Sequence, residues 1–295
     1  MTDTVNASAG GMFENKSPNL SLLTQLVRQK GERMTILDKL AAYARERVEN
    51  ARQKVSLEEL RRQAETLPKE EFAFEKALRG EKIAFICECK KASPSKGLIA
   101  PEFPYVEIAR EYEDAGADCI SVLTEPKWFL GSDEYLREIS QQVSIPCLRK
   151  DFTVDSYMIY EAKLLGASAV LLICSLLGEE KLKEYLSLCD ELGLSALVEA
   201  HDGAELSMAL RAKARIVGVN NRNLKDFTVD TDNTKRLRAL VPPEVLFISE
   251  SGIRTAEEVE ALRQIGVNGV LIGETLMRSA DKKTKLAELR GEVWK

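Results

Sequence analysis

Short apolar runs recur along the chain, and this repetition restricts the possible folds more than any other feature. Each run reads as a parallel strand buried on both faces, because few polar residues interrupt it. Helical patterns separate the runs, for example between Pro104 and Gly116, a proline at the start and a glycine past the end. The runs begin near Ile83, Cys119, Ile145, Ala169, Ser195, Ile216, Val245 and Gly269.

Three of these runs also resemble one another in sequence, at residues 116–123, 166–173 and 266–272. Such internal repetition favours a closed and regular arrangement. Eight strand–helix units in about 210 residues fit an α/β protein with a (β/α)8 TIM barrel. A doubly wound open sheet is the alternative, but it normally carries a GxGxxG turn after its first strand, and the sequence has none there.

The segment before the first strand is expected to form two parts. Residues 1–33 are polar and mixed, which predicts a poorly ordered tail. The single barrel domain is expected to span residues 34–295, with N-terminal helices within 35–80. One of these helices should open at Ser56, because a glutamate follows three residues later in a capping-box pattern. We expect these helices to close the bottom of the barrel and also to reach its mouth.

The composition excludes several classes of function. The net charge is −5 without a basic block, which argues against binding to nucleic acid or to a membrane surface. No apolar run approaches the roughly 20 residues needed to span a bilayer, and the N-terminus lacks a secretory signal. Six cysteines form no CxxC pair and no cluster with the single histidine, His201, for which we expect a loop role. These features predict a cytoplasmic protein with reduced cysteines and no metal. We expect a monomer, although these features do not fix the oligomeric state.

Polar residues gather where five of the predicted strands end, and barrel enzymes carry their chemistry at that end. Most of them lie two positions after a small or apolar residue on the same strand, so both side chains should face the inside of the barrel. Arg149 does not fit this parity, because it would occupy an outward position. Solvated strand ends or a structural ring of ion pairs are the alternatives. The residues are Glu88, Lys90, Lys150, Glu199, Asn220, Arg222, Glu250 and Ser251.

Such a cluster supports general acid–base catalysis. A lysine crowded by other cations and apolar walls should have a lowered pKa, and a glutamate near other carboxylates a raised one. Both pKa values would then approach the working pH, where proton transfer is most effective. The sequence shows no metal-ligand set and no cofactor fingerprint.

The loops after the last two strands indicate a phosphorylated small-molecule substrate. Phosphate sites of barrel enzymes usually lie after strands 7 and 8 beside a short extra helix. Glycines there let backbone N–H groups approach an anion. Ser93 in the first loop adds a hydroxyl. The candidate positions are Ser93, Gly252, Gly273 and Glu274.

The chain resembles indole-3-glycerol phosphate synthase over about residues 35–290. The resemblance is specific because six motifs occur together in the right order. They are residues 88–95, Leu123-Thr124-Glu125, residues 148–152, Leu197-Val198-Glu199, residues 218–224 and residues 249–253. It implies the ring closure of 1-(2-carboxyphenylamino)-1-deoxyribulose 5-phosphate in tryptophan biosynthesis, with loss of carbon dioxide and water and without cofactor or metal.

The resemblance also implies roles for individual residues. Lys150 would be the general acid of ring closure, Glu199 the acid/base of dehydration, and Lys90 an assisting cation. Glu88, Asn220 and Glu250 would position the substrate and the lysines, and Arg222 and Ser251 would line the substrate site. The phosphate would bind at Ser93, Gly252, Gly273 and Glu274. Phe129 and Leu172 would flank the aromatic ring.

Two other functions remain open from the residues. One is a Schiff-base aldolase or related phosphosugar enzyme on the same fold, with Lys150 as nucleophile. The other is a sugar-phosphate binding protein without catalysis. A fusion of two barrel enzymes is excluded, because the chain is too short to hold a second barrel.

Overall fold

A computed structural model describes residues 34–69, 71–224 and 226–292. The predicted tail, residues 1–33, lies outside the described residues. From Ile36 onward the chain forms one compact unit. The following paragraphs concern this unit.

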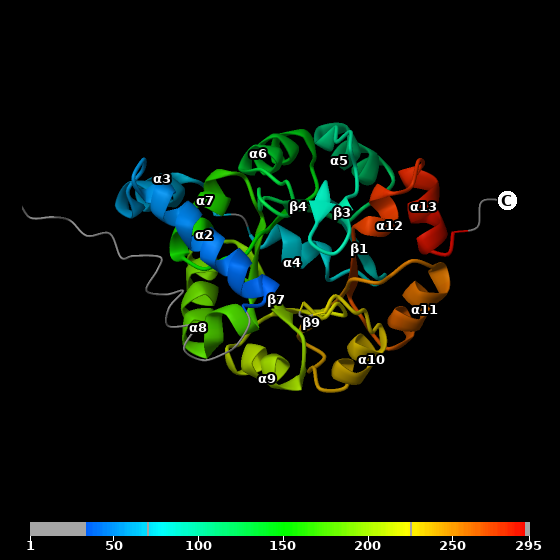
Figure 1. The fold of residues 1–295 in the computed structure, drawn as a ribbon. Coiled ribbons are helices and arrows are strands. Elements are labelled where there is room, and N and C mark those ends of the chain that lie inside the picture. The colour runs from blue at the N-terminus through cyan, green and yellow to red at the C-terminus, as the bar shows by residue number, and fades with distance from the viewer. Residues whose placement is uncertain (1–33, 70, 225, 293–295) are drawn as a thin grey trace, which may run out of the picture. The chain divides into compact units, whose positions relative to one another are not determined.

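Eight parallel strands close into a barrel within the described residues, which confirms the predicted (β/α)8 fold (Figure 1). The ring closes because β1 pairs with both β4 and β10. The strands are β1 (Ala84–Cys89), β4 (Cys119–Leu123), β5 (Cys147–Lys150), β6 (Ala169–Ile173), β7 (Ser195–Ala200), β8 (Ile216–Asn220), β9 (Leu246–Glu250) and β10 (Gly269–Ile272). A small hairpin, β2 (Ala92–Ser93) with β3 (Gly97–Leu98), occupies the loop after β1 and was not predicted.

Helices surround the barrel, and side-chain caps fix several of their starts. Asp155 accepts a hydrogen bond from the N–H of Tyr157, and Thr255 forms a capping box with Glu258. Gly178 interrupts α8 with φ 72° and so kinks this helix near its start. The helices are α5 (Tyr105–Asp114), α6 (Asp133–Gln142), α7 (Ser156–Leu164), α8 (Cys174–Leu192), α9 (Gly203–Arg211), α10 (Asp232–Arg238), α11 (Ala256–Gln264), α12 (Glu274–Met277) and α13 (Lys282–Leu289).

The inside of the barrel changes from apolar to charged along the strands. Ile86, Leu148, Leu197 and Ile248 are fully buried at inward positions. On the same strands, the inward positions nearer the carboxyl end carry acidic or basic side chains. An apolar floor therefore lies beneath the charged groups and keeps water from reaching them from below.

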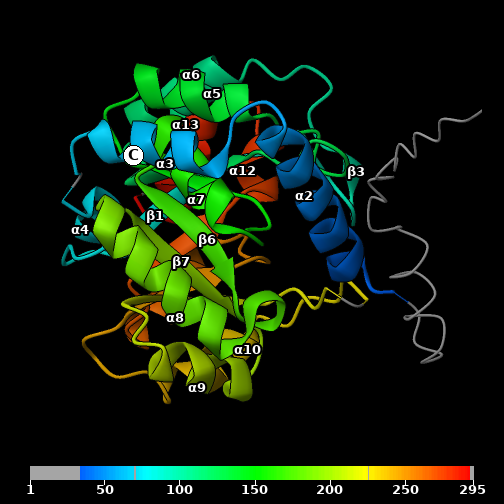
Figure 2. The same ribbon diagram turned by 90° about the vertical axis from the view of Figure 1, so that its left-hand side faces the viewer.

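The helices before β1 take two different positions. Helix α4 (Ala73–Ala77) lies at the end of the barrel where strands begin, because the N–H of Glu75 donates to the Ser195 hydroxyl at the start of β7. Helix α2 (Ile36–Arg52) lies at the opposite end (Figure 2). Its residues Ile36 and Leu40 line the cavity at the mouth. Helix α3 (Leu57–Thr66) is capped by Ser56, as predicted, and packs against α7.

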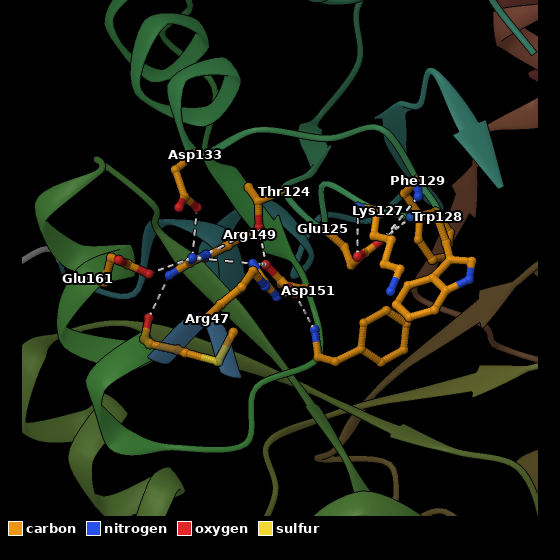
Figure 3. A network of polar contacts seen from close by, with 12 residues as sticks. Arg47, Thr124, Glu125, Lys127, Trp128, Phe129, Asp133, Arg149, Asp151 and Glu161 are labelled. Carbon is orange, nitrogen blue, oxygen red and sulfur yellow. Dashed lines mark hydrogen bonds and ion pairs between the residues drawn. The ribbon is translucent and has the colours of Figure 1, made fainter. Parts of the chain in front are cut away.

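A two-point ion pair holds α2 in place. Arg47 donates to both carboxylate oxygens of Asp151, at 3.0 and 2.6 Å. The same carboxylate accepts from the Thr124 hydroxyl at 2.6 Å and from the N–H of Phe152 at 2.7 Å (Figure 3). Since Asp151 directly follows Lys150, this carboxylate connects α2 to the end of β5.

We expect Arg47→Met to lower the free energy of unfolding by about 3 kcal/mol, because it leaves the buried Asp151 charge without its main partner. Arg52→Met is the matched control, since Arg52 lies on the same helix and pairs with Asp155 at a more exposed site than that of Arg47 and Asp151. This control should cost less than about 1 kcal/mol. Urea denaturation measures both values, and equal losses in the two variants would contradict the anchoring role of Arg47.

Candidate active site

A cavity of about 430 Å3 opens at the carboxyl ends of the strands. The structure brings thirteen of the fourteen predicted site residues to its wall, and they come from both the strands and the loops that follow them. These residues are Glu88, Lys90, Ser93, Phe129, Lys150, Glu199, Asn220, Arg222, Glu250, Ser251, Gly252, Gly273 and Glu274.

Leu172 is the exception, and the prediction that it lines the site is wrong. Its register partner on β7 is Val198, whereas Leu171 and Ile173 pair with the inward Leu197 and Glu199. Leu172 therefore points outward to the helices, since neighbouring positions on a strand face opposite sides. Leu171 and Ile173 line the cavity in its place.

The centre of the site is the Lys150 ammonium between two carboxylates. Its Nζ lies 3.1 Å from Glu199 Oε2 and 3.0 Å from Glu250 Oε2. The side-chain amide of Asn220 donates to Glu199 Oε1 at 3.2 Å. The three charged groups come from β5, β7 and β9, so only the closed barrel can bring them together.

A second ion pair lies on β1. Lys90 Nζ contacts Glu88 Oε1 at 2.5 Å. A Cβ atom at Gly273 would collide with both groups. Gly218 has the same function at the centre, where a Cβ would collide with Glu250 Oε1. Glycine at these two positions therefore makes room for charged side chains as well as for any ligand.

The surroundings of Lys150 correct the prediction of a lowered lysine pKa. Burial alone lowers this pKa, but the negative charges of Glu199, Glu250 and Glu88 outweigh it and raise the pKa above its usual range. Lys150 therefore carries its proton at neutral pH. The prediction failed because the nearest neighbours are carboxylates and not cations.

The two carboxylates beside Lys150 differ in their pKa values. Burial raises the pKa of Glu199, but Lys150 and then His201 oppose it, and the net result is a lowered pKa. Burial dominates at Glu250 and raises its pKa to about 7, although Lys150 opposes it. At neutral pH the site therefore contains one ionised carboxylate and one that readily holds a proton, as acid–base chemistry requires.

Arg149 faces outward, which explains its misfit to the inward parity. It is 2% exposed and lies between the barrel wall and the surrounding helices (Figure 3). Its NH2 contacts Asp133 and Glu161, each at 2.7 Å, and its NH1 donates to the carbonyl of Met158. A charge is tolerated at this outward position because α6 and α7 supply two carboxylates.

Glu125 has a role that the sequence did not reveal beyond its place in a motif. Its carboxylate accepts the backbone N–H groups of Lys127, Trp128 and Phe129 at 2.8–2.9 Å (Figure 3). This fixes the loop after β4 and presents the ring of Phe129 beside that of Phe152, with centroids 5.9 Å apart. The two rings form an aromatic wall of the cavity.

The predicted phosphate positions lie in the loops that follow β1, β9 and β10, which are neighbours in the ring, and they line the cavity. Gly252 follows β9 with φ +86°, and Gly273 caps the short helix α12. The Glu274 side chain pairs with Arg278 at 3.1 Å. Cationic residues that the sequence analysis did not single out also line this part of the cavity. They are Arg254, Arg278 and Lys285.

Two kinds of feature are absent from the part of the chain that the structure describes. No group of three or more His, Cys, Asp or Glu side chains there could hold a metal ion. No helix there has the length and apolar character needed to cross a membrane. The cysteines there are all buried, and none of them forms a disulfide.

The fold and the cavity define a (β/α)8 barrel protein of the enzyme class that carries charged side chains at the carboxyl ends of its strands. A sequence model described as indole-3-glycerol phosphate synthase matches residues 37–289. The enzyme of that name from Ruminiclostridium cellulolyticum is 60% identical over 259 residues, which cover 88% of this chain and 100% of that protein. That from Leuconostoc mesenteroides is 55% identical and covers 87% and 99%. The chain belongs to the indole-3-glycerol phosphate synthase family, a family of carboxy-lyases.

Solved structures with low sequence identity share the fold. The 3-hexulose-6-phosphate synthase from Salmonella typhimurium aligns with a TM-score of 0.58 at 14% identity, covering 71% of this chain and 97% of that chain. Thiamine phosphate pyrophosphorylase from Pyrococcus furiosus aligns with a TM-score of 0.55 at 17% identity, covering 74% and 96%. At such identities these similarities concern the architecture alone.

The raised pKa of Glu250 predicts a pH-dependent contribution to stability. Between pH 4.5 and about 7 the unfolded chain loses this proton while the folded protein keeps it. The contribution of Glu250 to the free energy of unfolding is therefore fully present below pH 4.5 and is lost as the pH rises to about 7. Relative to Glu250→Gln, the wild type should lose about 1–3 kcal/mol across this window.

Urea denaturation at several pH values measures this difference. The contribution of Glu199 has the opposite sign, is lost as the pH falls, and largely cancels because both proteins contain it. Glu244→Gln, an exposed change just before the same strand, controls for the loss of a charge alone. A constant difference between wild type and Glu250→Gln from pH 4.5 to 8 would show that Glu250 titrates normally.

Proposed function

We propose that this protein closes the indole ring of 1-(2-carboxyphenylamino)-1-deoxyribulose 5-phosphate to give indole-3-glycerol phosphate, with loss of carbon dioxide and water. Membership of the family supports this reaction. The observation that carries the residue assignment is the contact of Lys150 with both Glu199 and Glu250 at the barrel mouth. The substrate is a double anion with an aromatic ring, and the cavity offers cations and an aromatic wall.

Lys150 is the general acid of ring closure. Its raised pKa keeps the ammonium charged, so it can donate a proton to the ribulose carbonyl oxygen as the carbon–carbon bond forms. Glu250 and Glu199 hold the ammonium in a dry site, where its charge acts strongly on the developing alkoxide. The charged state also argues against Lys150 as a Schiff-base nucleophile, which must be neutral to attack.

Glu199 is the acid/base of the later dehydration, with Asn220 holding its second oxygen. Lys90, oriented by Glu88, binds the substrate carboxylate or assists a proton transfer. Decarboxylation then needs no separate acid, because ring closure places positive charge next to the departing carboxylate.

The remaining residues orient the two ends of the substrate. Phe129 flanks the aromatic ring, and Arg222 with Ser251 lines the path between ring and phosphate. The phosphate contacts a hydroxyl and backbone N–H groups at Ser93, Gly252, Gly273 and Glu274. We further propose that the protein is a cytoplasmic monomer that uses neither cofactor nor metal and binds neither nucleic acid nor membrane.

The purified protein should convert the carboxyphenylamino substrate into a product with indole fluorescence in the presence of a chelator. Lys150→Ala should lower turnover by about 100-fold or more, because it removes the general acid. Lys181→Ala, an exposed change on α8, should leave turnover unchanged. A metal requirement would contradict the proposal, and borohydride trapping of substrate on Lys150 would favour the aldolase alternative. Substrate binding without turnover by the wild type would indicate a binding protein.

A further inference from the structure

His201, the single histidine of the chain, lies beside the acid/base Glu199 and not in an inert loop position. Its Nε2 is 3.5 Å from Glu199 Oε1. On the other side of the ring, Nδ1 is 3.2 Å from Glu205 Oε2. The imidazole therefore bridges a carboxylate of the site and a carboxylate of α9.

The surrounding contacts fix the orientation of this ring. Glu205 also accepts the backbone N–H of His201 at 2.9 Å, and the side-chain amide of Asn233 donates to the His201 carbonyl at 3.0 Å. Because Glu205 is an acceptor, Nδ1 carries a proton. Nε2 is buried and has no hydrogen-bond partner among the described residues. Glu199 Oε1 lies 3.5 Å from it, so a second proton on the ring would have a ready acceptor.

The charges around the ring favour its protonated form. Burial lowers the pKa of His201, but Glu205, Glu199 and Glu250 together raise it above its usual value. Cys174 lies near the same carboxylates, and burial raises the pKa of its thiol to about 12, so it stays neutral. The opposing cation is Lys150, on the far side of Glu199.

We propose that His201 is a positioning residue that acts through Glu199 as a proton relay, with Glu205 holding its Nδ1. This inference rests on the proposed role of Glu199 in dehydration. Its geometric basis is the unpartnered, buried Nε2 aimed at that carboxylate and the fixed orientation of the ring.

The proton balance of the relay closes within the site. The imidazolium Nε2 releases its proton to ionised Glu199, which becomes a carboxylic acid, while Nδ1 keeps its proton against Glu205. Glu199 donates this proton to the departing hydroxyl, and water leaves. The proton that the substrate loses on aromatisation returns through Glu199 to Nε2. Neither an external acid nor an oxidant is needed.

Proton NMR tests the coupling without any turnover, because an untagged protein has one histidine and therefore one set of imidazole signals. The pKa of His201 should lie above the ordinary 6.5 in the wild type and fall towards it in Glu199→Gln. Nitrogen-15 shifts should show the proton of the neutral ring on Nδ1. A pKa of His201 that is the same in the wild type and in Glu199→Gln would overturn the relay.

Kinetics then separate the relay from a purely structural role. His201→Gln keeps a donor near Glu199 but cannot titrate, and His201→Asn keeps the contact with Glu205. Both should lower kcat about tenfold, less than loss of a direct acid–base group, with KM nearly unchanged and a flatter pH profile. Unchanged kcat and pH profile in both variants would refute the relay. If the wild type does not convert the substrate, the proposed function fails, and the NMR coupling alone then decides whether His201 and Glu199 share a proton.

Discussion

The site depends on keeping one ammonium, that of Lys150, charged in a largely dry cavity. Burial penalises this charge, and nearby carboxylates compensate for it, above all the two at about 3 Å. Those carboxylates come from strands two and four positions further along the ring, so the compensation exists only once the barrel has closed. The ion pairs of the site therefore form only when the barrel closes, because an open sheet would keep the three charged groups apart.

The barrel accommodates this charged cluster through small local adjustments. Gly218 and Gly273 remove side chains where Glu250, Glu88 and Lys90 need space. The carboxylates of Asp151 and Glu125 accept hydrogen bonds from backbone N–H groups, and that of Asp151 also binds Arg47. These contacts fix the chain at the ends of β5 and β4. The inward charges pair with one another at the cavity, while a second group of charges holds the frame. Which of the two groups a residue joins depends on whether it faces inward or outward.

Much of the fold and most of the site could be predicted, because strand period and the position of strand ends are local properties. The failures required information from distant residues. Whether Leu171 or Leu172 faces the inside of the barrel depends on the register of β6 against β7, and an uninterrupted apolar run does not reveal it. The sign of the Lys150 pKa shift depends on which charges lie nearest, and the relevant glutamates are 49 and 100 residues away. The pairing of Arg47 with Asp151 spans 104 residues, and no local pattern indicates it.

Helix α2 contributes Ile36 and Leu40 to the mouth, although it precedes the barrel in the sequence and belongs to none of its eight units. The apolar rim of the entrance is thus supplied by a helix outside the strand–helix repeat, which is held by its buried apolar face and by the pairing of Arg47 with Asp151. Evolution can therefore alter which rings the enzyme admits by changing this helix, while the strands that carry the proton chemistry stay intact. A protein engineer who seeks new aromatic substrates has the same freedom.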